Sequence, residues 1–489
     1  MAEKAKLDYK KTILIGFGFM ATSIAWAIYD PYVTKILNRL LTESPLITSW
    51  SNALIERFPD LVRFAQAQGE SVEMAGGGFT LVPLFIGVIM TFDNLFGVIF
   101  QPAFGKLSDR CHSRLGKRRP FIVSCAPISA VLFFLIPVMS KVSLPATMAV
   151  IILFVFSMSL WRAPVVALMP DLTPTELRSE GNAVINLMGG AGSLVGLVAG
   201  TLVVAIYGAV TGLSSDQIPE EDYFPYVFLI GSIIMVLGML VLLFFVKEPD
   251  SRLSVTAAQN MAADEAARRK AEKEAKKAEK EKIKAEKLTT GERVSLIFML
   301  LGLFFLFCGT NAITTFFSLF AAEVLGKTTS EATIMMGVFA VFSAIGAIPA
   351  GFCGKKLGRK KTILLGLGMF MLVFVLYLLT RSMALIWVAL VVGGVANMFI
   401  TVNTLPLVLE IGGVDKVGTF TGYYYTATFS AQIASPIIYG LVRMFTGTYM
   451  SLFAYCPVVF VLSILCILFV KHGEALPEEV IQKAKEAED

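Results

Sequence analysis

The sequence predicts an all-α membrane protein of twelve transmembrane helices, arranged as two six-helix bundles. Hydrophobic residues make up 56% of the 489 residues and charged residues only 16%, whereas soluble domains are about a quarter charged. Twelve apolar runs are each long enough to cross a bilayer, which takes roughly 20 residues. A highly charged segment separates the first six runs from the last six.

The apolar runs define the expected spans. The first run is too long for a signal peptide and lacks a cleavage site of small residues, so we read it as the first span. We expect an N-terminal bundle over 1–246, a C-terminal bundle over 293–471 and a polar tail over 472–489. The runs occupy approximately 12–37, 79–104, 119–140, 144–170, 181–209, 226–246, 293–322, 332–354, 361–380, 383–409, 418–445 and 450–471.

Two polar segments interrupt this pattern. The segment 38–78 is partly amphipathic and is expected to form an external or interfacial helix. The segment 247–292 is rich in Ala, Glu and Lys without an apolar stripe, which predicts a solvated, mostly helical linker. This linker mixes both charge signs and lacks aromatic residues, so we expect no nucleic-acid binding.

The basic residues predict the orientation of the chain. If the N-terminus is cytoplasmic, most of the 42 Lys and Arg fall on the cytoplasmic side, as the positive-inside rule requires. An even number of spans then returns the C-terminus to the same side. We therefore expect a multi-pass protein of the plasma membrane with both termini, the linker and the tail in the cytoplasm.

Two loops are related to each other. The sequences GKLSDRCHSRLGKRRPF (105–121) and GFCGKKLGRKK (351–361) follow spans two and eight, at matching places in the two halves. Both read Gly, three residues, two polar residues, then Gly followed by two basic residues. Such a parallel internal repeat is typical of one large carrier architecture. The second loop has Lys355 at the acidic position.

The first loop resembles the signature of the major facilitator superfamily, and the resemblance implies that superfamily's fold. It also implies a cytoplasmic latch, in which a glycine permits close helix approach and an acidic side chain pairs with arginine. The basic cluster would anchor the loop at the cytoplasmic face, although a role as topology anchors alone stays open. The latch residues are Gly105, Asp109, Arg110, Gly116, Arg118 and Arg119.

A narrower resemblance is to the sucrose-transporter group, close to the glycoside–pentoside–hexuronide cation symporters. It rests on QPAFGKLSDRCHSRLGKRRPFI (101–122), ALMPDL (167–172) and PYV (31–33). The resemblance implies proton-coupled uptake of a sugar or glycoside of the sucrose or maltose kind. Val155 and Val166 stand where sucrose transporters have an Asp and an Arg in span four.

Three ionisable residues lie at membrane depth, where charges are costly and usually functional. They are Asp93 in span two, Arg162 in span four and Asp30 in span one. We expect Asp93 and Arg162 to face a central cavity, where burial favours the neutral carboxyl and the guanidinium favours the ionised one. A cycle that changes their separation would then couple transport to protons. The alternative is a static charge pair that fixes helix packing.

Neutral polar and aromatic side chains at similar depth form the second set of candidates. Amides and hydroxyls suit the hydroxyl groups of a sugar, and aromatic rings suit the flat apolar face of a pyranose. The alternative is interhelical hydrogen bonding, worth about 0.6 kcal/mol on average. The candidate substrate-binding residues are Trp26, Gln101, Asn186, Asn311, Thr315, Asn397, Asn403, Tyr424 and Gln432.

These observations predict a monomeric secondary active transporter for a small polar solute. Sodium coupling, export of another small organic solute, and a transporter-like sensor remain as alternatives. No His, Cys or paired-carboxylate cluster at membrane depth suggests an enzyme or a metal site, so no cofactor beyond H+ or Na+ is expected. Glu323 and Glu410 lie at helix ends and are expected to be solvated.

Overall fold

The computed structural model describes residues 7–71, 78–111, 113–173, 177–248, 289–412 and 417–472. Helices account for nearly all of this part of the chain, and it contains no strand. Eleven helical segments within it are long and apolar enough to cross a membrane. The helical membrane architecture predicted from composition is therefore confirmed.

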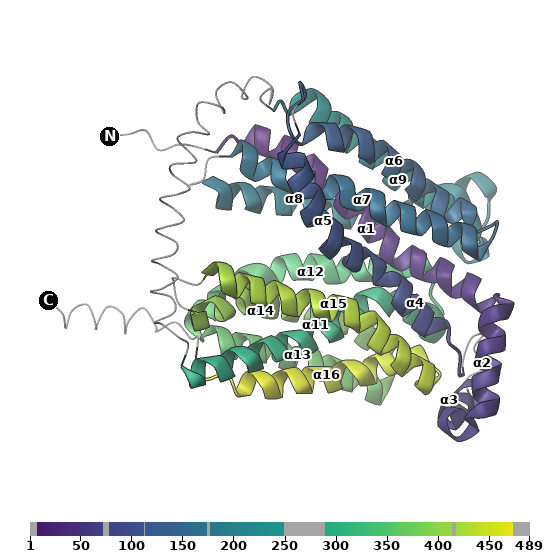
Figure 1. Cartoon of the computed structure of the whole chain (residues 1–489). Helices are drawn as coiled ribbons and strands as arrows, with labels where there is room; N and C mark the ends of the chain where they lie inside the picture. The colour runs from purple at the N-terminus through teal and green to yellow at the C-terminus, as the bar shows by residue number, and fades with distance from the viewer. Residues whose placement is uncertain are drawn as a thin grey trace, which may run out of the picture.

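The helices form two bundles, which Figure 1 shows one above the other. A pair of shorter helices, α2 (Pro45–Arg57) and α3 (Pro59–Ser71), lies outside them. The first bundle contains α1 (Tyr9–Thr42), α4 (Val82–Met90), α5 (Phe92–Asp109), α6 (Arg119–Met139), α7 (Leu144–Leu172), α8 (Arg178–Thr211) and α9 (Glu220–Phe245). The second contains α11 (Thr290–Leu325), α12 (Thr329–Lys356), α13 (Arg359–Thr380), α14 (Met383–Gly412), α15 (Val417–Thr446) and α16 (Leu452–Leu468).

Helix α15 accounts for the difference between twelve expected spans and eleven sufficiently apolar ones. It is 30 residues long, but a run of tyrosines and threonines makes it too polar to count among the apolar spans. One of its polar residues, Gln432, lines a cavity between the two bundles that is described below. Helix α15 packs against α11 and α14 in the bundle and against α4 across it.

The second span is interrupted, where the sequence predicted one continuous helix. Helix α4 ends at Met90 and α5 begins at Phe92. Between them, the Thr91 hydroxyl donates to the carbonyl oxygen of Val88 at 2.6 Å, and the Thr91 N–H bonds the same oxygen at 3.3 Å. Such side-chain bonds compete with the regular helical pattern. The break places Asp93 in the first turn of a new helix.

Small residues let helices approach closely within the first bundle. A Cβ on Gly192 of α8 would lie 2.5 Å from the carbonyl oxygen of Met20 in α1, and one on Gly196 would lie 3.0 Å from that of Ile24. Side chains cannot be added at such distances without moving the backbone. Close backbone approach of this kind drives helix association in lipid.

Within the described residues, the close contacts between the bundles lie toward one end. We call the end at which α1 begins and α16 ends the inner end, and the opposite one the outer end. At the outer end a Cβ on Gly87 of α4 would lie 2.2 Å from the carbonyl oxygen of Pro436 in α15. Near the inner end, a Cβ on Gly105, Gly190, Gly351 or Gly422 would meet no described atom within 4 Å. Figure 1 shows the bundles separating toward that end.

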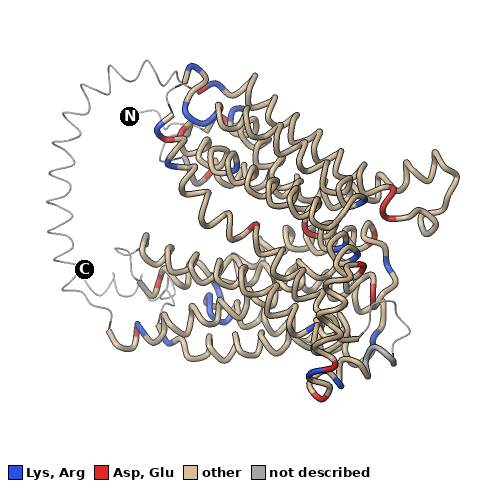
Figure 2. Tube along the Cα trace, turned by 45° about the vertical axis from the view of Figure 1, so that its right-hand side comes forward, with Lys and Arg blue, Asp and Glu red and all other residues tan. Residues whose placement is uncertain are grey.

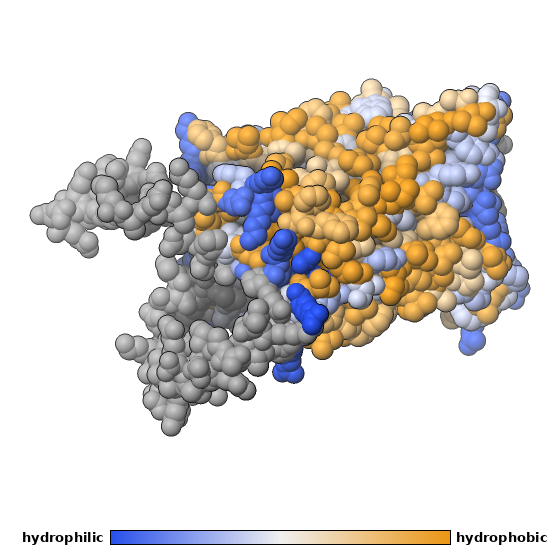
Figure 3. All heavy atoms as spheres, turned by 90° about the horizontal axis from the view of Figure 1, so that it is seen from above, coloured by the Kyte–Doolittle hydropathy of each residue, from blue (hydrophilic) through white to orange (hydrophobic). Residues whose placement is uncertain are grey.

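The surface agrees with a membrane environment. Charged residues gather toward the two ends of the helices, with few between them (Figure 2). An apolar belt runs between the ends on the face seen in Figure 3. The predicted external segment contains α2 and α3, joined to the start of α4 by a hydrogen bond from the Leu81 N–H to the Ser51 hydroxyl at 3.2 Å.

Two predictions fall outside the described residues. The central part of the charged linker, 249–288, and the tail from 473 onward are not described. The predicted division into 1–246, 247–292, 293–471 and 472–489 therefore stays a prediction in its boundaries.

Candidate functional site

A cavity of about 720 Å³ lies between the two bundles. Its volume falls within the range of roughly 300–1,000 Å³ that is typical of small-molecule sites. One wall comes from α1, α4, α5, α7 and α8, and the other from α11, α12, α14 and α15. The contacts at the outer end close it on that side, so that it opens toward the inner end.

All three predicted intramembrane charges lie on one wall of this cavity. Asp30 belongs to α1, Asp93 to α5 and Arg162 to α7, so that each comes from the first bundle. No ionisable side chain from the second bundle lines the described cavity. The charge chemistry of the site is therefore confined to one half of the molecule.

Asp93 is held in the first turn of α5. Its Oδ1 accepts hydrogen bonds from the backbone N–H of Asn94 at 2.6 Å and from the Asn94 Nδ2 at 2.8 Å. Asp93 and Arg162 also attract each other electrostatically. A helix N-terminus favours negative charge, so the break at Thr91 places this carboxylate where the start of α5 stabilises its ionised form.

Arg162 lies beside an aromatic residue of α1. Its guanidinium carbon is 5.8 Å from the centroid of the Trp26 ring, a distance at which a cation–π interaction contributes about 0.5–1 kcal/mol or more. The Trp26 ring in turn packs edge-on against Tyr29 at 5.3 Å. Trp26 lines the cavity, so the aromatic candidate and the cationic candidate form one unit.

Asp30 lies where the cavity meets the closed outer end. One turn later in α1, the Thr34 hydroxyl is 3.1 Å from the Ser318 hydroxyl of α11. The Ser318 hydroxyl also donates to the carbonyl oxygen of Pro31 at 3.2 Å. A change at Asp30 would therefore act directly beside a contact between the two bundles.

The opposite wall presents neutral polar groups. Asn311 and Thr315 of α11, Asn397 of α14 and Gln432 of α15 all line the cavity. The Asn311 Nδ2 donates to the carbonyl oxygen of Phe307 at 2.8 Å, a bond that leaves the side-chain oxygen available to a solute. Amides and hydroxyls of this kind both donate and accept hydrogen bonds.

Four predicted substrate contacts lie elsewhere. Gln101, Asn186, Asn403 and Tyr424 are not among the residues that line the cavity. Asn403 is buried between helices, where its Nδ2 donates to the carbonyl oxygens of Phe399 and Ala350 at 2.9 and 3.2 Å. The Asn186 amide donates to Asn182 of its own helix at 2.8 Å. These amides have structural partners, which favours the alternative reading of interhelical or local bonding.

Several cavity residues were not singled out from the sequence. They are small hydroxyl or amide side chains within apolar runs, and such residues are too common in membrane helices to stand out. Asn94 had a usable signal because it follows an intramembrane aspartate. The wall residues of this kind are Ser23, Asn94, Ser193, Ser318, Thr333 and Ser343.

The latch loop forms an ion-pair network around Arg118, at the inner end. Its guanidinium contacts Asp109 at 2.5 Å and Asp171 at 2.8 Å, and it also bonds the Ser108 hydroxyl and the carbonyl oxygen of Gly105. Burial lowers the pKa of Arg118, but the two carboxylates outweigh that effect and raise it. Asp171 was not predicted to take part, although it lies within the ALMPDL motif.

The remaining latch residues have separate roles. Gly116 has a φ of +100°, and a Cβ there would clash with Glu248, so the turn requires glycine. Arg119 donates to the carbonyl oxygen of Leu243 in α9, whereas Arg110 is exposed. The expected close approach at Gly105 is absent in this conformation, because the bundles are apart at the inner end.

The second half has a related ion pair. Arg359 at the start of α13 contacts Glu410 near the end of α14 at 2.8 Å, which parallels Arg118 before α6 and Asp171 at the end of α7. The expectation that Glu410 is solvated is therefore wrong. It is also wrong for Glu323, which is only 9% exposed and pairs with Arg443.

Comparisons with known proteins agree with this architecture. The family model of the Major Facilitator Superfamily matches residues 12–436, with a further match over 299–487. An uncharacterised MFS-type transporter of Schizosaccharomyces pombe is 27% identical over 155 residues. That match spans 31% of this chain and 34% of the yeast protein, about a third of each.

Solved structures of low sequence identity share the fold. A bacterial homologue of the human lysosomal transporter Spinster, inward-facing and occupied, has a TM-score of 0.62 at 13% identity, over 95% of this chain and 97% of that one. The nucleoside transporter NupG has a TM-score of 0.61 at 13% sequence identity, over 94% of this chain and 100% of that one. The inward-open xylose transporter XylE from E. coli has a TM-score of 0.58 at 18% identity, over 96% of this chain and 97% of that one. Given the family match across most of its length, this chain belongs to the Major Facilitator Superfamily.

Proposed function

We propose that this transporter is a proton-coupled symporter of a sugar or glycoside, related to the sucrose-transporter group and working by alternating access. The observation that carries the proposal is the division of the cavity wall. Carboxyl groups that can exchange a proton come from the first bundle, and amides and hydroxyls come from the second. A solute held between them would touch both halves of the molecule.

The neutral wall supports a hydroxyl-rich solute. Asn311, Asn397 and Gln432 offer both donors and acceptors, which match the hydroxyl groups of a sugar. Trp26 adds an aromatic face on the opposite wall. Among structural neighbours, one is a D-xylose–proton symporter and another a nucleoside transporter, and both of these solutes carry a sugar ring.

The charged wall supports coupling to protons. Asp93 shares the wall with Arg162 and with Asp30. The positive charge of Arg162 favours the ionised carboxylate of Asp93, whereas burial favours its neutral form. Any movement of α1, α5 and α7 relative to one another therefore changes the tendency of Asp93 to bind a proton. Two carboxylates on one wall also suit a sodium ion, whose preferred ligands are oxygen atoms. Sodium coupling is therefore the second candidate.

The proposed orientation places the inner end in the cytoplasm, together with both termini, in the plasma membrane. The basic latch loop and the segment around Arg359 lie at that end, in agreement with the positive-inside rule. In this orientation the cavity opens to the cytoplasm.

Transport by purified protein in liposomes tests the proposal. An inward proton gradient should drive accumulation of a labelled disaccharide such as sucrose or maltose, with alkalinisation of the outside solution, in the absence of sodium. The Asp93→Asn variant should lose accumulation but keep exchange of internal for external solute, because a neutral amide still permits the conformational cycle. The matched control is Asp60→Asn, in the first turn of the external helix α3.

Three outcomes would contradict the proposal. Accumulation that follows a sodium gradient alone would favour the second candidate. Full proton-driven accumulation by Asp93→Asn would remove Asp93 from the coupling step. Absence of transport for mono- and disaccharides, in protein that still moves another solute, would reject the sugar assignment.

A further inference from the structure

A second, smaller cavity lies at the outer end, on the closed side of the molecule. It has a volume of about 330 Å³ and is lined by both bundles. Lys35, Asn38 and Thr80 come from the first half, and Glu323, Arg443 and Tyr449 from the second. Its lining shares no residue with that of the central cavity.

The floor of this outer cavity is a buried polar cluster. Arg443 is 1% exposed, and its Nη2 contacts the Glu323 carboxylate at 2.8 Å. The other Glu323 oxygen accepts from the Thr448 hydroxyl at 2.8 Å and from the Tyr449 N–H at 2.7 Å. Arg443 also donates to the carbonyl oxygen of Gly78, in the segment that enters α4, at 3.3 Å.

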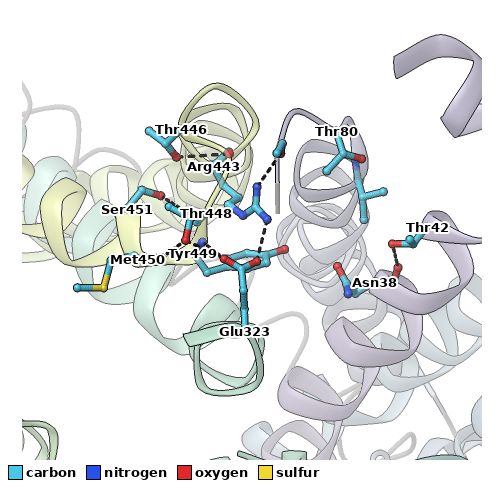
Figure 4. Close-up of polar contacts among 12 residues, drawn as sticks. Asn38, Thr42, Thr80, Glu323, Arg443, Thr446, Thr448, Tyr449, Met450 and Ser451 are labelled. Atoms are coloured by element: carbon cyan, nitrogen blue, oxygen red, sulfur yellow. Dashed lines mark hydrogen bonds and ion pairs between the residues drawn. The ribbon is translucent and has the colours of Figure 1, made fainter. Parts of the chain in front are cut away.

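The same cluster fixes the orientation of the Tyr449 ring. The Arg443 guanidinium carbon lies 4.5 Å from its centroid. Figure 4 shows the ring pointing from the second bundle toward Asn38 and Thr80 of the first. The Tyr449 hydroxyl is buried and has no hydrogen-bond partner among the described residues, and a buried hydroxyl without a partner is costly. A group with acceptor oxygens in the cavity would satisfy it.

The hydrogen-bond donors of the wall indicate the class of ligand. Glu323 offsets Arg443, and the Lys35 ammonium group, whose ion-pair partner Glu220 is not part of the cavity lining, adds further N–H donors to this wall. The nearest carboxylate to Lys35 is Glu220, at 3.5 Å, and its other oxygen is engaged by Thr329. Besides the polar Asn38, Thr42 and Thr80, the remaining lining is apolar and consists of Val82, Pro83, Leu319 and Ala322.

We infer that the outer cavity binds a small organic monocarboxylate. The carboxylate would accept hydrogen bonds from the Tyr449 hydroxyl and from Lys35, and the apolar body would rest against α4 and α11. Because both bundles supply the walls, the bound ligand holds the outer end closed and stabilises the conformation seen here. The site is thus an inhibitory one, independent of the solute carried in the central cavity.

The test uses purified full-length protein with two ligands of the same shape. Sodium benzoate carries the carboxylate, and benzamide replaces it with a neutral amide. Benzoate should raise the thermal midpoint in a saturable way, whereas benzamide and an equal concentration of sodium chloride should not. Lys35→Gln and Tyr449→Phe should each weaken benzoate binding about tenfold, which corresponds to about 1.4 kcal/mol.

Two further variants separate this site from the rest of the molecule. Asp93→Asn, in the central cavity, and Tyr226→Phe, on the exposed side of α9, should bind benzoate as the unaltered protein does. Benzoate outside liposomes should lower the maximal transport rate without changing the apparent affinity for solute. Lack of any benzoate shift would mean that the cavity holds water only. A benzoate shift in Lys35→Gln and Tyr449→Phe as large as that of the unaltered protein would place the ligand elsewhere. Either result overturns the inference.

Discussion

Arg162 combines two properties that a lysine would not. Its charge attracts Asp93, and its planar guanidinium lies 5.8 Å from the Trp26 ring centroid. A lysine keeps the charge but lacks the planar, delocalised group that stacks on aromatic faces. The two contributions can therefore be separated by substitution.

We expect Arg162→Lys to keep proton-driven accumulation. It should weaken the apparent solute affinity by about threefold to tenfold, because the guanidinium contact with the Trp26 ring is lost. Arg162→Gln should lose accumulation as well, because Asp93 is left without its neighbouring positive charge. Uptake in liposomes with and without a pH gradient measures both effects. In a Trp26→Leu background the Arg162→Lys change should have no further effect on affinity, and an undiminished effect there would exclude the stacking contact.

The sequence revealed the charged residues of the site more readily than the neutral ones. An aspartate or arginine within an apolar run stands out because its burial is costly, and Asp30, Asp93 and Arg162 all line the cavity. Amides do not stand out in this way. Asn397 lines the cavity whereas Asn403 bonds helix carbonyls, and only the rotation and packing of α14 decide between them.

Glycines of α4, α5 and α15 differ in their surroundings between the two ends of the molecule. Toward the outer end, Gly87 of α4 and Gly440 of α15 lie against Pro436 and Pro83 across the bundle boundary. Toward the inner end, Gly105 and Gly422 face open space. The outer end thus has glycines in close contact across the bundle boundary, and the inner end has glycines without such contact. This arrangement suits closure of the two ends in alternation.

We expect Gly105→Leu to fold normally and to bind solute, because a Cβ added there meets no described atom within 4 Å in this conformation. It should slow turnover by at least about tenfold, since closure of the inner end requires close backbone approach of α5. Thermal unfolding, solute binding and single-turnover transport measure these three properties. The matched control is Gly368→Leu in α13, where a Cβ also meets nothing within 4 Å, and equal rates in both variants would contradict the proposed approach.

The proposed alternating access requires the two bundles to separate at the outer end during each cycle. Thr34 and Ser318 bring α1 and α11 within 3.1 Å there, and Glu220 accepts bonds from the N–H and hydroxyl of Thr329 at 2.8 Å. Interfaces of this kind have two arrangements and do not deform continuously. A covalent bond across them should therefore stop transport completely.

We expect the double variant Thr34→Cys with Ser318→Cys, in protein without its six native cysteines, to lose transport when oxidised and to regain it on reduction. The disulfide would hold the outer end closed while leaving the cavity open to the inner end. Radiolabelled uptake before and after reductant measures the effect, with Thr34→Cys alone as the control. Transport by the fully oxidised double variant would show that the outer end does not need to open.

Composition and hydrophobic run length by themselves determined that this chain is a helical membrane protein, because apolar segments of that length are stable in lipid, and the repeated loop indicated two related halves. They also pointed to the three intramembrane charges that line the cavity, Asp30, Asp93 and Arg162. The tertiary structure alone decided which polar side chains converge on the cavity, that Thr91 interrupts the second span, and that Glu323 is buried against Arg443. Those outcomes depend on helix rotation and on contacts between residues far apart in the chain, which no local pattern encodes.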